Sequence, residues 1–140
     1  MSLESSFKYK WIMSRTKKLN WASAVDACKA KGMELAEIKS DENSKVLLKF
    51  LNNFFHVHRY DPRAYVGISR EANSEIYKTV SNGNKVNFNL VVHETLMDYF
   101  GKTCLVADAF QSRAKFTVSL CDQEHQFICE KIEGSASGIM

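Results

Sequence analysis

Large apolar residues alternate with polar ones near the start of the chain, which is the pattern of a half-buried strand. Phe7, Tyr9, Trp11 and Met13 occupy every second position, and a period of two places them on one face of an extended segment. After a polar turn, Asn20 precedes the segment WASAVDACKAKG. Asparagine is a favoured N-cap residue, so the pattern predicts a strand over residues 7–13 and a helix that begins after Asn20.

The predicted helix has one apolar face. Trp21, Ala24, Val25 and Cys28 follow the spacing i, i+3, i+4 and i+7, which gathers them on one side of a helix. Gly32 is a common residue just past a helix C-terminus, so we expect the helix to end there. Cys28 therefore lies on the buried face, where a disulfide would anchor the helix to another element.

A second helix is predicted after the short alternating segment MELAEI, which we expect to be extended. Ser40 is a suitable N-cap, and Asp41 and Glu42 suit the positive end of the helix dipole. The apolar stripe of this helix consists of Val46, Leu47, Phe50 and Leu51, with Phe54 as an extension. The segment NNFFHVHRY is expected to form a loop-like region between this helix and the next strand.

The second half of the chain is dominated by short β-like runs. AYVGIS is a predicted core strand, and the runs TCLVADAF, KFTVSLC and HQFICEKI predict three further strands. Residues 70–103 form a long, weakly patterned stretch with a turn signal at Asn82 and Gly83. Helices segregated from antiparallel strands are typical of an α+β fold.

We expect one domain over residues 7–132. The polar opening MSLESS, residues 1–6, is predicted to be a flexible extension, and the tail EGSASGIM, residues 133–140, is predicted to be disordered.

Composition and charge exclude several classes of protein. The 140 residues are 45% hydrophobic and 25% charged, which is ordinary globular composition. No apolar run approaches the roughly 20 residues that a membrane helix needs, and a net charge of +3 is too mild to predict nucleic-acid binding. Lys8, Lys10, Arg15, Lys17 and Lys18 crowd one stretch. They form a candidate anion patch, whereas the simpler interpretation is a solvated strand edge protected from aggregation.

The four cysteines, Cys28, Cys104, Cys121 and Cys129, narrow the possibilities further. No pair has the C-x-x-C spacing of a zinc ribbon or a thioredoxin-like site. An even number in a small domain fits two disulfides in an oxidising compartment, against the alternative of four reduced thiols in the cytosol. The sequence alone leaves three pairings open. Cys104 with Cys121 would staple neighbouring strands, and Cys28 with Cys129 would tie the first helix to the last strand.

Taken together, these segments resemble the C-type lectin-like domain family. The resemblance rests on the early NWASAVDACKAKGMELAEI, the central YVGI, and TCLVA followed by C-x7-C at the end, and it spans about residues 7–132. KGMELAEI is also similar to secreted lectins of arthropods. The resemblance implies a C-type lectin-like fold of two helices, antiparallel sheets and a long irregular loop roughly between residues 70 and 103.

The resemblance also settles how the cysteines are expected to pair. It implies the disulfides Cys28–Cys129 and Cys104–Cys121. It further implies a secreted, extracellular protein from which a signal peptide has been removed.

Calcium-dependent members of this family hold Ca²⁺ and a sugar through two stretches, and this chain has neither. One is a Glu-Pro-Asn or Gln-Pro-Asp triplet in the long loop, whereas the one proline here is Pro62. The other is a Trp-Asn-Asp triplet three residues before the third cysteine, where this chain has Phe116, Thr117 and Val118. Ca²⁺ takes about six to eight oxygen ligands, and the Val118 side chain offers none. Lys102 occupies the place of a glutamate that often completes the site, so we expect no calcium site.

His56 and His58 suggest a different metal site, because residues two apart on a strand face the same way. Such a site needs further ligands, for which Asp61, His93 and His125 are the candidates, and two surface histidines are the commoner arrangement. No nucleophile elbow or paired-carboxylate site is recognisable. We therefore expect no metal, no cofactor and no enzymatic activity.

The segment NNFFHVHRY also contains a candidate protein interface. Phe55, His56, His58, Arg59 and Tyr60 combine aromatic side chains with arginine, a composition that interfaces favour. The alternative is that the phenylalanines cover the end of the second helix.

The sequence thus predicts a secreted, non-enzymatic recognition module that binds an extracellular protein without calcium, in an immune, haemostatic, salivary or venom-type role. The alternative is a calcium-independent lectin for a carbohydrate or a glycosaminoglycan-like polyanion. No nucleic-acid partner and no membrane span are expected. Because all four cysteines are used within the domain, a dimer would be non-covalent.

Overall fold

The structure is a computed structural model that describes residues 2–5, 10–14, 17–58, 63–72, 74–86, 92, 101–109 and 114–131. Within these residues it contains two helices and eight strands. The helices are α1 (Trp21–Lys29) and α2 (Asp41–His58). The strands are β1 (Ser2–Ser5), β2 (Lys10–Met13), β3 (Met33–Leu35), β4 (Arg63–Arg70), β5 (Tyr77–Thr79), β6 (Thr103–Asp108), β7 (Lys115–Leu120) and β8 (Gln126–Lys131).

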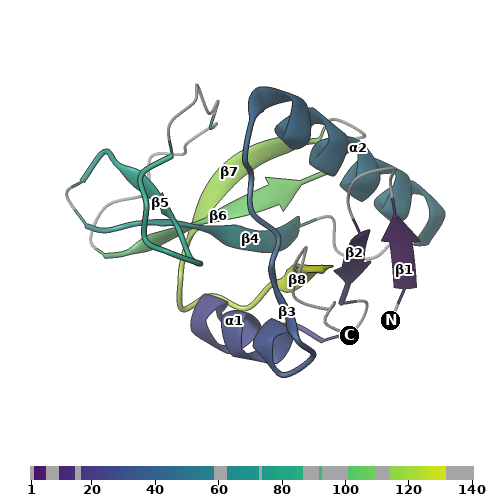
Figure 1. The fold of residues 1–140 in the computed structure, drawn as a ribbon, viewed down its shortest axis with the longest axis horizontal. Helices are drawn as coiled ribbons and strands as arrows, with labels where there is room; N and C mark the ends of the chain where they lie inside the picture. Colours follow the sequence, from purple (N-terminus) through teal and green to yellow (C-terminus); the bar gives the residue numbers. More distant parts are fainter. Residues whose placement is uncertain are drawn as a thin grey trace.

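The described strands join into one sheet whose main path runs β1-β2-β8-β4-β6-β7 (Figure 1). β3 pairs with β8 and β5 pairs with β4 beside this path. β4 and β8 run parallel, whereas the other pairs are antiparallel. The fold is therefore α+β, and it brings the early strand β2 beside the last strand β8.

Each face of the sheet buries one helix, with α1 below the strands and α2 above them in Figure 1. Alternate residues of the central strands divide between the two cores. Tyr65 and Phe127 pack with the buried face of α1, whereas their chain neighbours Val66 and Ile128 pack with α2. Successive strand residues point to opposite faces. A strand covered on both faces is therefore a continuous apolar run, as YVGI and FIC are.

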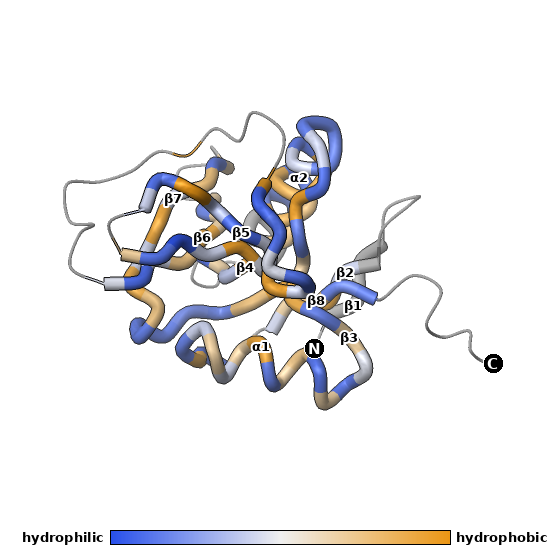
Figure 2. The backbone as a smooth tube through the Cα atoms, turned by 60° about the vertical axis from the view of Figure 1, so that its left-hand side comes forward, coloured by the Kyte–Doolittle hydropathy of each residue, from blue (hydrophilic) through white to orange (hydrophobic). Residues whose placement is uncertain are grey.

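Both helices begin where the sequence predicts, and α1 ends just before Gly32 as expected. The Asn20 side chain accepts a hydrogen bond from the Ser23 N–H at 2.9 Å at the start of α1. Ser40 Oγ accepts one from the Asn43 N–H at 3.0 Å at the start of α2. Gly32, three residues after α1, has φ of 72°, a left-handed conformation that glycine adopts without strain. Figure 2 shows hydrophobic and hydrophilic residues alternating along α1, as a helix with one buried face requires.

Two local expectations differ from the structure. α2 continues to His58, so residues 55–58 are helical and not loop-like. Residues two apart on a helix do not share a face, which removes the argument for His56 and His58 as paired metal ligands. Ser2–Ser5 form β1 and pair with β2, although the sequence predicted a flexible segment there.

Both expected disulfides are present. Cys28 of α1 bonds Cys129 of β8, and Cys104 of β6 bonds Cys121 just after β7. No free cysteine remains. The first disulfide joins two cysteines 101 residues apart in sequence, so it links helix α1 covalently to the last strand, β8.

Candidate functional site

A groove of about 480 Å³ lies beside β6 and β7. The described residues that line it are Thr117–Leu120 of β7, Thr103, Val106 and Asp108 of β6, and Arg63, Gln123 and His125. Hydroxyl, amide, imidazole and charged groups share the groove with a few aliphatic side chains. A ligand in this groove would therefore meet several hydrogen-bonding side chains among the described residues.

The end of the groove after β7 is held by hydrogen bonds to its backbone. The Tyr65 hydroxyl lies 2.6 Å from the Gln123 carbonyl oxygen and 3.1 Å from the Leu120 carbonyl oxygen, and its single proton is donated to one of the two at a time. Burial raises the pKa of Tyr65 to about 12, so this hydroxyl stays protonated well above neutral pH. Ser119 Oγ lies 3.0 Å from His125 Nε2, and the His125 ring meets the Tyr65 ring edge-on at 4.9 Å. The turn after β7 is thereby fixed to the core.

Thr103 contributes an unusual polar group to this groove. The residue is 2% exposed, and its hydroxyl oxygen has no hydrogen-bond partner in the part of the chain that the structure describes. A buried hydroxyl without a partner is unfavourable. The oxygen itself is buried from solvent, so its burial is a local cost to the stability of the fold.

The three residues at the family's calcium positions lie in β7. Phe116 is 3% exposed and packs in the core against α2. Thr117 pairs with Val106, and Val118 pairs with Leu105, in the β6–β7 ladder. The prediction that the residues ahead of Cys121 build a strand is therefore confirmed.

Lys102 occupies the place of the glutamate that often completes the family's calcium site, and it contacts two of its neighbours. Its Nζ lies 4.8 Å from the centre of the Trp21 ring and 3.8 Å from Glu71 Oε2. Its carbonyl accepts from the Cys121 N–H at 3.3 Å, and the Cys121 carbonyl accepts from the Trp21 N–H at 3.0 Å. An ammonium group thus stands where the calcium-dependent pattern has a carboxylate. The described residues also contain no group of three or more His, Cys, Asp or Glu side chains placed to hold a metal.

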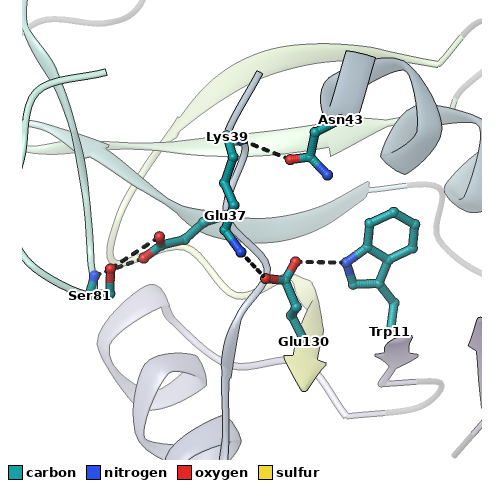
Figure 3. A network of polar contacts seen from close by, with 6 residues as sticks. All are labelled: Trp11, Glu37, Lys39, Asn43, Ser81 and Glu130. Carbon is teal, nitrogen blue, oxygen red and sulfur yellow. Dashed lines mark hydrogen bonds and ion pairs between the residues drawn. The ribbon is translucent and has the colours of Figure 1, made fainter. Parts of the chain in front are cut away.

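A polar network crosses the opposite side of the domain, between β2, β8 and the start of α2 (Figure 3). Glu130 is 7% exposed, and it accepts from Trp11 Nε1 at 2.9 Å and from Lys39 Nζ at 3.0 Å. The Lys39 N–H donates to Asn43 Oδ1 at 2.8 Å. Burial lowers the pKa of Lys39, but the charge and hydrogen bond of Glu130 outweigh it and raise the pKa overall. The buried carboxylate is therefore paired.

Glu37 anchors the turn that follows β5 (Figure 3). It is 6% exposed, and its carboxylate accepts from the Ser81 N–H at 2.8 Å and the Ser81 hydroxyl at 3.1 Å. Burial raises the pKa of Glu37, and the hydrogen bonds from Ser81 oppose this only in part, while Glu34 and Glu130 raise it further. Gly67 lies close to this anchor, because a Cβ there would meet Val80 Cγ1 at 2.9 Å and Glu37 Cγ at 3.1 Å.

Comparison with known proteins identifies the family to which this fold belongs. The family model described as Lectin C-type domain matches residues 17–131. The chain belongs to the C-type lectin domain family. No curated protein sequence matches the chain.

Solved structures share the fold of this C-type lectin domain at low sequence identity. CEL-IV superposes with a TM-score of 0.73 at 15% identity, covering 91% of this chain and 90% of its own. The carbohydrate-recognition domain of the mouse scavenger receptor C-type lectin has a TM-score of 0.70 at 19% identity, covering 92% of each chain. EMS16, an antagonist of the collagen receptor integrin α2β1, has a TM-score of 0.60 at 15% identity, covering 93% and 96%. Domains of this family are binding domains, and some of their neighbours in fold are lectins while others are not.

The structure does not assemble the predicted interface of this C-type lectin domain into a described site. Phe55, His56 and His58 lie on α2, and Arg59 and Tyr60 fall outside the described residues. The interface therefore stays a prediction.

The predicted anion patch is described only in part. Lys17 and Lys18 are exposed on the connection between β2 and α1, and Lys10 lies in β2. Lys8 and Arg15 fall outside the described residues.

Of the other candidate metal ligands, the structure describes only His125, which is buried beside Ser119. Asp61 and His93 fall outside the described residues. No helix within the described residues is long and apolar enough to cross a membrane.

Sequence reasoning missed the groove and the Glu37 anchor of this C-type lectin domain. Thr103 and Ser119 come from different strands, and only the β6–β7 register brings them to one groove. His125 was considered only as a metal ligand. A local signal did exist for Glu37, because it stands between Ala36 and Ile38, which are both buried.

Proposed function

We propose that this C-type lectin domain is a secreted, non-enzymatic recognition module that binds an extracellular protein partner without calcium. The observation that carries the proposal is the position of Lys102, whose ammonium group is held between Trp21 and Glu71. A Ca²⁺ ion at this position would meet a like charge. Val118 adds no side-chain oxygen, so two of the family's calcium positions are lost together.

A protein partner is favoured because the loss of calcium ligands also removes the family's contacts to sugar. In calcium-dependent members the same side chains that hold Ca²⁺ hydrogen-bond the sugar hydroxyls. The fold alone does not require a sugar, since EMS16 is named as an antagonist of an integrin and ovocleidin-17 as a protein of the eggshell calcified layer. Two disulfides suit an extracellular setting.

The proposal is tested by presenting the labelled protein to an array of extracellular proteins and to a glycan array. Each array is run once in calcium and once in EDTA. We expect binding to one or more proteins, equal in both buffers, and no response from glycans. Binding that EDTA abolishes would overturn the proposal that this domain binds its partner without calcium. Binding confined to glycans would overturn the choice of a protein partner.

A polyanion is the second candidate ligand, and the exposure of Lys17 and Lys18 favours it. Contacts between exposed charges are screened by salt, and the Debye length falls from about 10 Å at 0.1 M to about 3 Å at 1 M. Binding to heparin that is lost in high salt, and weakened by changing Lys17 and Lys18 to glutamine, would support this candidate. The matched control is Lys45→Gln, on the exposed side of α2.

A further inference from the structure

Two lysines face each other across the hairpin that begins with β5. Lys85, on the segment that returns after the turn, forms an antiparallel bridge with Lys78 of β5. Two backbone hydrogen bonds of 2.9 Å flank this bridge, from the Thr79 N–H to the Asn84 carbonyl and from the Val86 N–H to the Tyr77 carbonyl. Lys78 and Lys85 are therefore a non-hydrogen-bonded pair, the kind in which opposite Cα atoms come closest, at about 4.5 Å.

Both lysines lie on the outer face of this hairpin. Tyr77 and Val86, their neighbours in the chain, pack against the core on the α2 side of the sheet, and successive residues of an extended segment point to opposite faces. Lys78 and Lys85 are accordingly exposed. Ile76, directly before β5, continues the alternation and is 42% exposed. The outer face thus combines two ammonium groups with one large apolar side chain.

No carboxylate neutralises the two lysines within the part of the chain that the structure describes. In the β4–β5 ladder Lys78 lies opposite Ser69, which is uncharged. None of the ion pairs within 4.0 Å among the described residues includes Lys78 or Lys85. Glu71, just after β4, lies 3.8 Å from Lys102. Like charges directly opposite each other in a sheet are destabilising, so this pair lowers the stability of the free protein.

The backbone of the hairpin holds the two lysines at this spacing. The Val80 N–H donates to the Gly67 carbonyl of β4 at 2.9 Å, and the buried Glu37 carboxylate accepts from the Ser81 N–H at 2.8 Å. The turn is thereby fixed to the core between the two lysines. A ligand that bridges them would find their backbone positions already set, which lowers the ordering cost of binding.

We propose that an acidic segment of the partner protein binds the outer face of this hairpin, with a carboxylate between Lys78 and Lys85 and an apolar side chain against Ile76. The inference rests on the proposed function and names the chemistry of its partner. A carboxylate at this place replaces one repulsion by two attractions. Complementary charge of this kind gives an interface specificity and speeds association.

The composition of the hairpin favours a protein segment over a polyanionic sugar. Lys78 and Lys85 are the only cations in residues 74–86, so the face matches one or two adjacent carboxylates and not a long row of sulfate groups. Ile76 offers apolar area, and a protein segment has apolar side chains that gain free energy by covering it. The polyanion candidate uses Lys17 and Lys18, which lie on the connection between β2 and α1.

The decisive variant is Lys78→Glu, because it places a carboxylate opposite Lys85. We expect the urea midpoint of the free protein to rise by about 0.1–0.5 M, while binding of the partner segment falls. Loss of a merely structural contact would lower the midpoint instead. High salt should raise the midpoint of the wild type relative to that of Lys78→Glu, since salt screens the exposed repulsion.

The binding test uses a displayed library of linear eight-residue peptides, selected on the intact, disulfide-bonded protein in EDTA at low salt. We expect enrichment of peptides that combine Asp or Glu with a large apolar residue. Lys78→Gln should weaken their binding about threefold and Lys78→Glu about tenfold. The matched control is Lys49→Glu, an equal change of charge at an exposed position of α2, which should alter binding less than about twofold.

Several outcomes would overturn the inference. They are the recovery of no acidic peptide, equal binding to Lys78→Glu, and an equal loss of binding in Lys49→Glu. A urea midpoint of Lys78→Glu that is unchanged or lower would show that the two lysines do not repel each other. Heparin that binds more tightly than any selected peptide and is released by Lys78→Glu would overturn the choice of a protein segment in favour of a polyanion.

The failure of this inference is distinguishable from the failure of the proposed function. If the protein identified on the array binds equally in EDTA and equally to Lys78→Glu, the calcium-free partner stands and docking on the hairpin is wrong. If partner binding requires calcium, the proposed function is wrong whatever the peptides do.

Discussion

The Glu37→Gln substitution tests whether burial or hydrogen bonding dominates at the anchor of the β5 turn. Glutamine has the same shape, and its carbonyl can still accept from the Ser81 N–H, now 2.8 Å from the carboxylate. Its amide loses the charge that burial disfavours. Because the lost charge and the lost acceptor act in opposite directions, we expect a stability change within about 1 kcal/mol at pH 7, with the glutamine variant equal or more stable.

The effect of pH on this variant has a definite sign. Burial raises the pKa of Glu37 above its ordinary 4.5, so the folded protein binds a proton more readily than the unfolded chain does. The Glu37 contribution to stability is then fully present below pH 4.5 and is lost as the pH rises through the raised pKa. The wild type should therefore gain stability relative to Glu37→Gln on going from pH 7 to pH 4.

The assay is urea unfolding of both proteins without reductant, at several pH values from 7 to 4. Ser81→Ala is the matched control, because it removes the hydroxyl at 3.1 Å and keeps the N–H. It should enlarge the gain at low pH, since a contact that favours the ionised form is gone. The reasoning is refuted if Glu37→Gln is less stable than wild type by more than about 1 kcal/mol at pH 7 and the difference closes on acidification. That result would mean that the Ser81 bonds outweigh burial.

Three further substitutions test other parts of the fold. Cys28→Ser opens a disulfide that spans 101 residues and should cost about 2–5 kcal/mol; a melting temperature like that of the parent in non-reducing buffer would contradict the role given to this bond. Gly67→Ala forces a Cβ to within 3.0 Å of the Leu35 carbonyl and should cost about 1–3 kcal/mol in urea unfolding, an expectation that an unchanged midpoint would disprove. Trp11→Phe removes one of the hydrogen bonds to buried Glu130 and should cost at least about 1.5 kcal/mol, with Trp11→Tyr as a second variant that retains a polar atom.

Much of the fold follows from local pattern. Asn20 and Ser40 mark the two helix starts because a side-chain oxygen next to a free backbone N–H needs no distant partner. The runs YVGI and FIC mark strands that are covered on both faces, since only such strands are continuously apolar. The four cysteines and their spacing led through the family resemblance to the two disulfides that the structure contains. The extent of α2 was missed because the aromatic residues after Asn53 weaken the helical pattern without ending the helix.

For the candidate site, some properties follow from residue type and others only from the arrangement of the strands. That Val118 and Lys102 cannot supply calcium with side-chain oxygens is a property of residue type, and the sequence by itself determined it. The groove beside β7 and the unpaired Thr103 hydroxyl depend on which strand lies beside which and in what register. Register is a relation between two strands, and a shift of one residue would send every side chain of β7 to the opposite face of the sheet. Only the tertiary structure decided it, because the packing of both sheet faces against α1 and α2 admits one register and no local pattern records it.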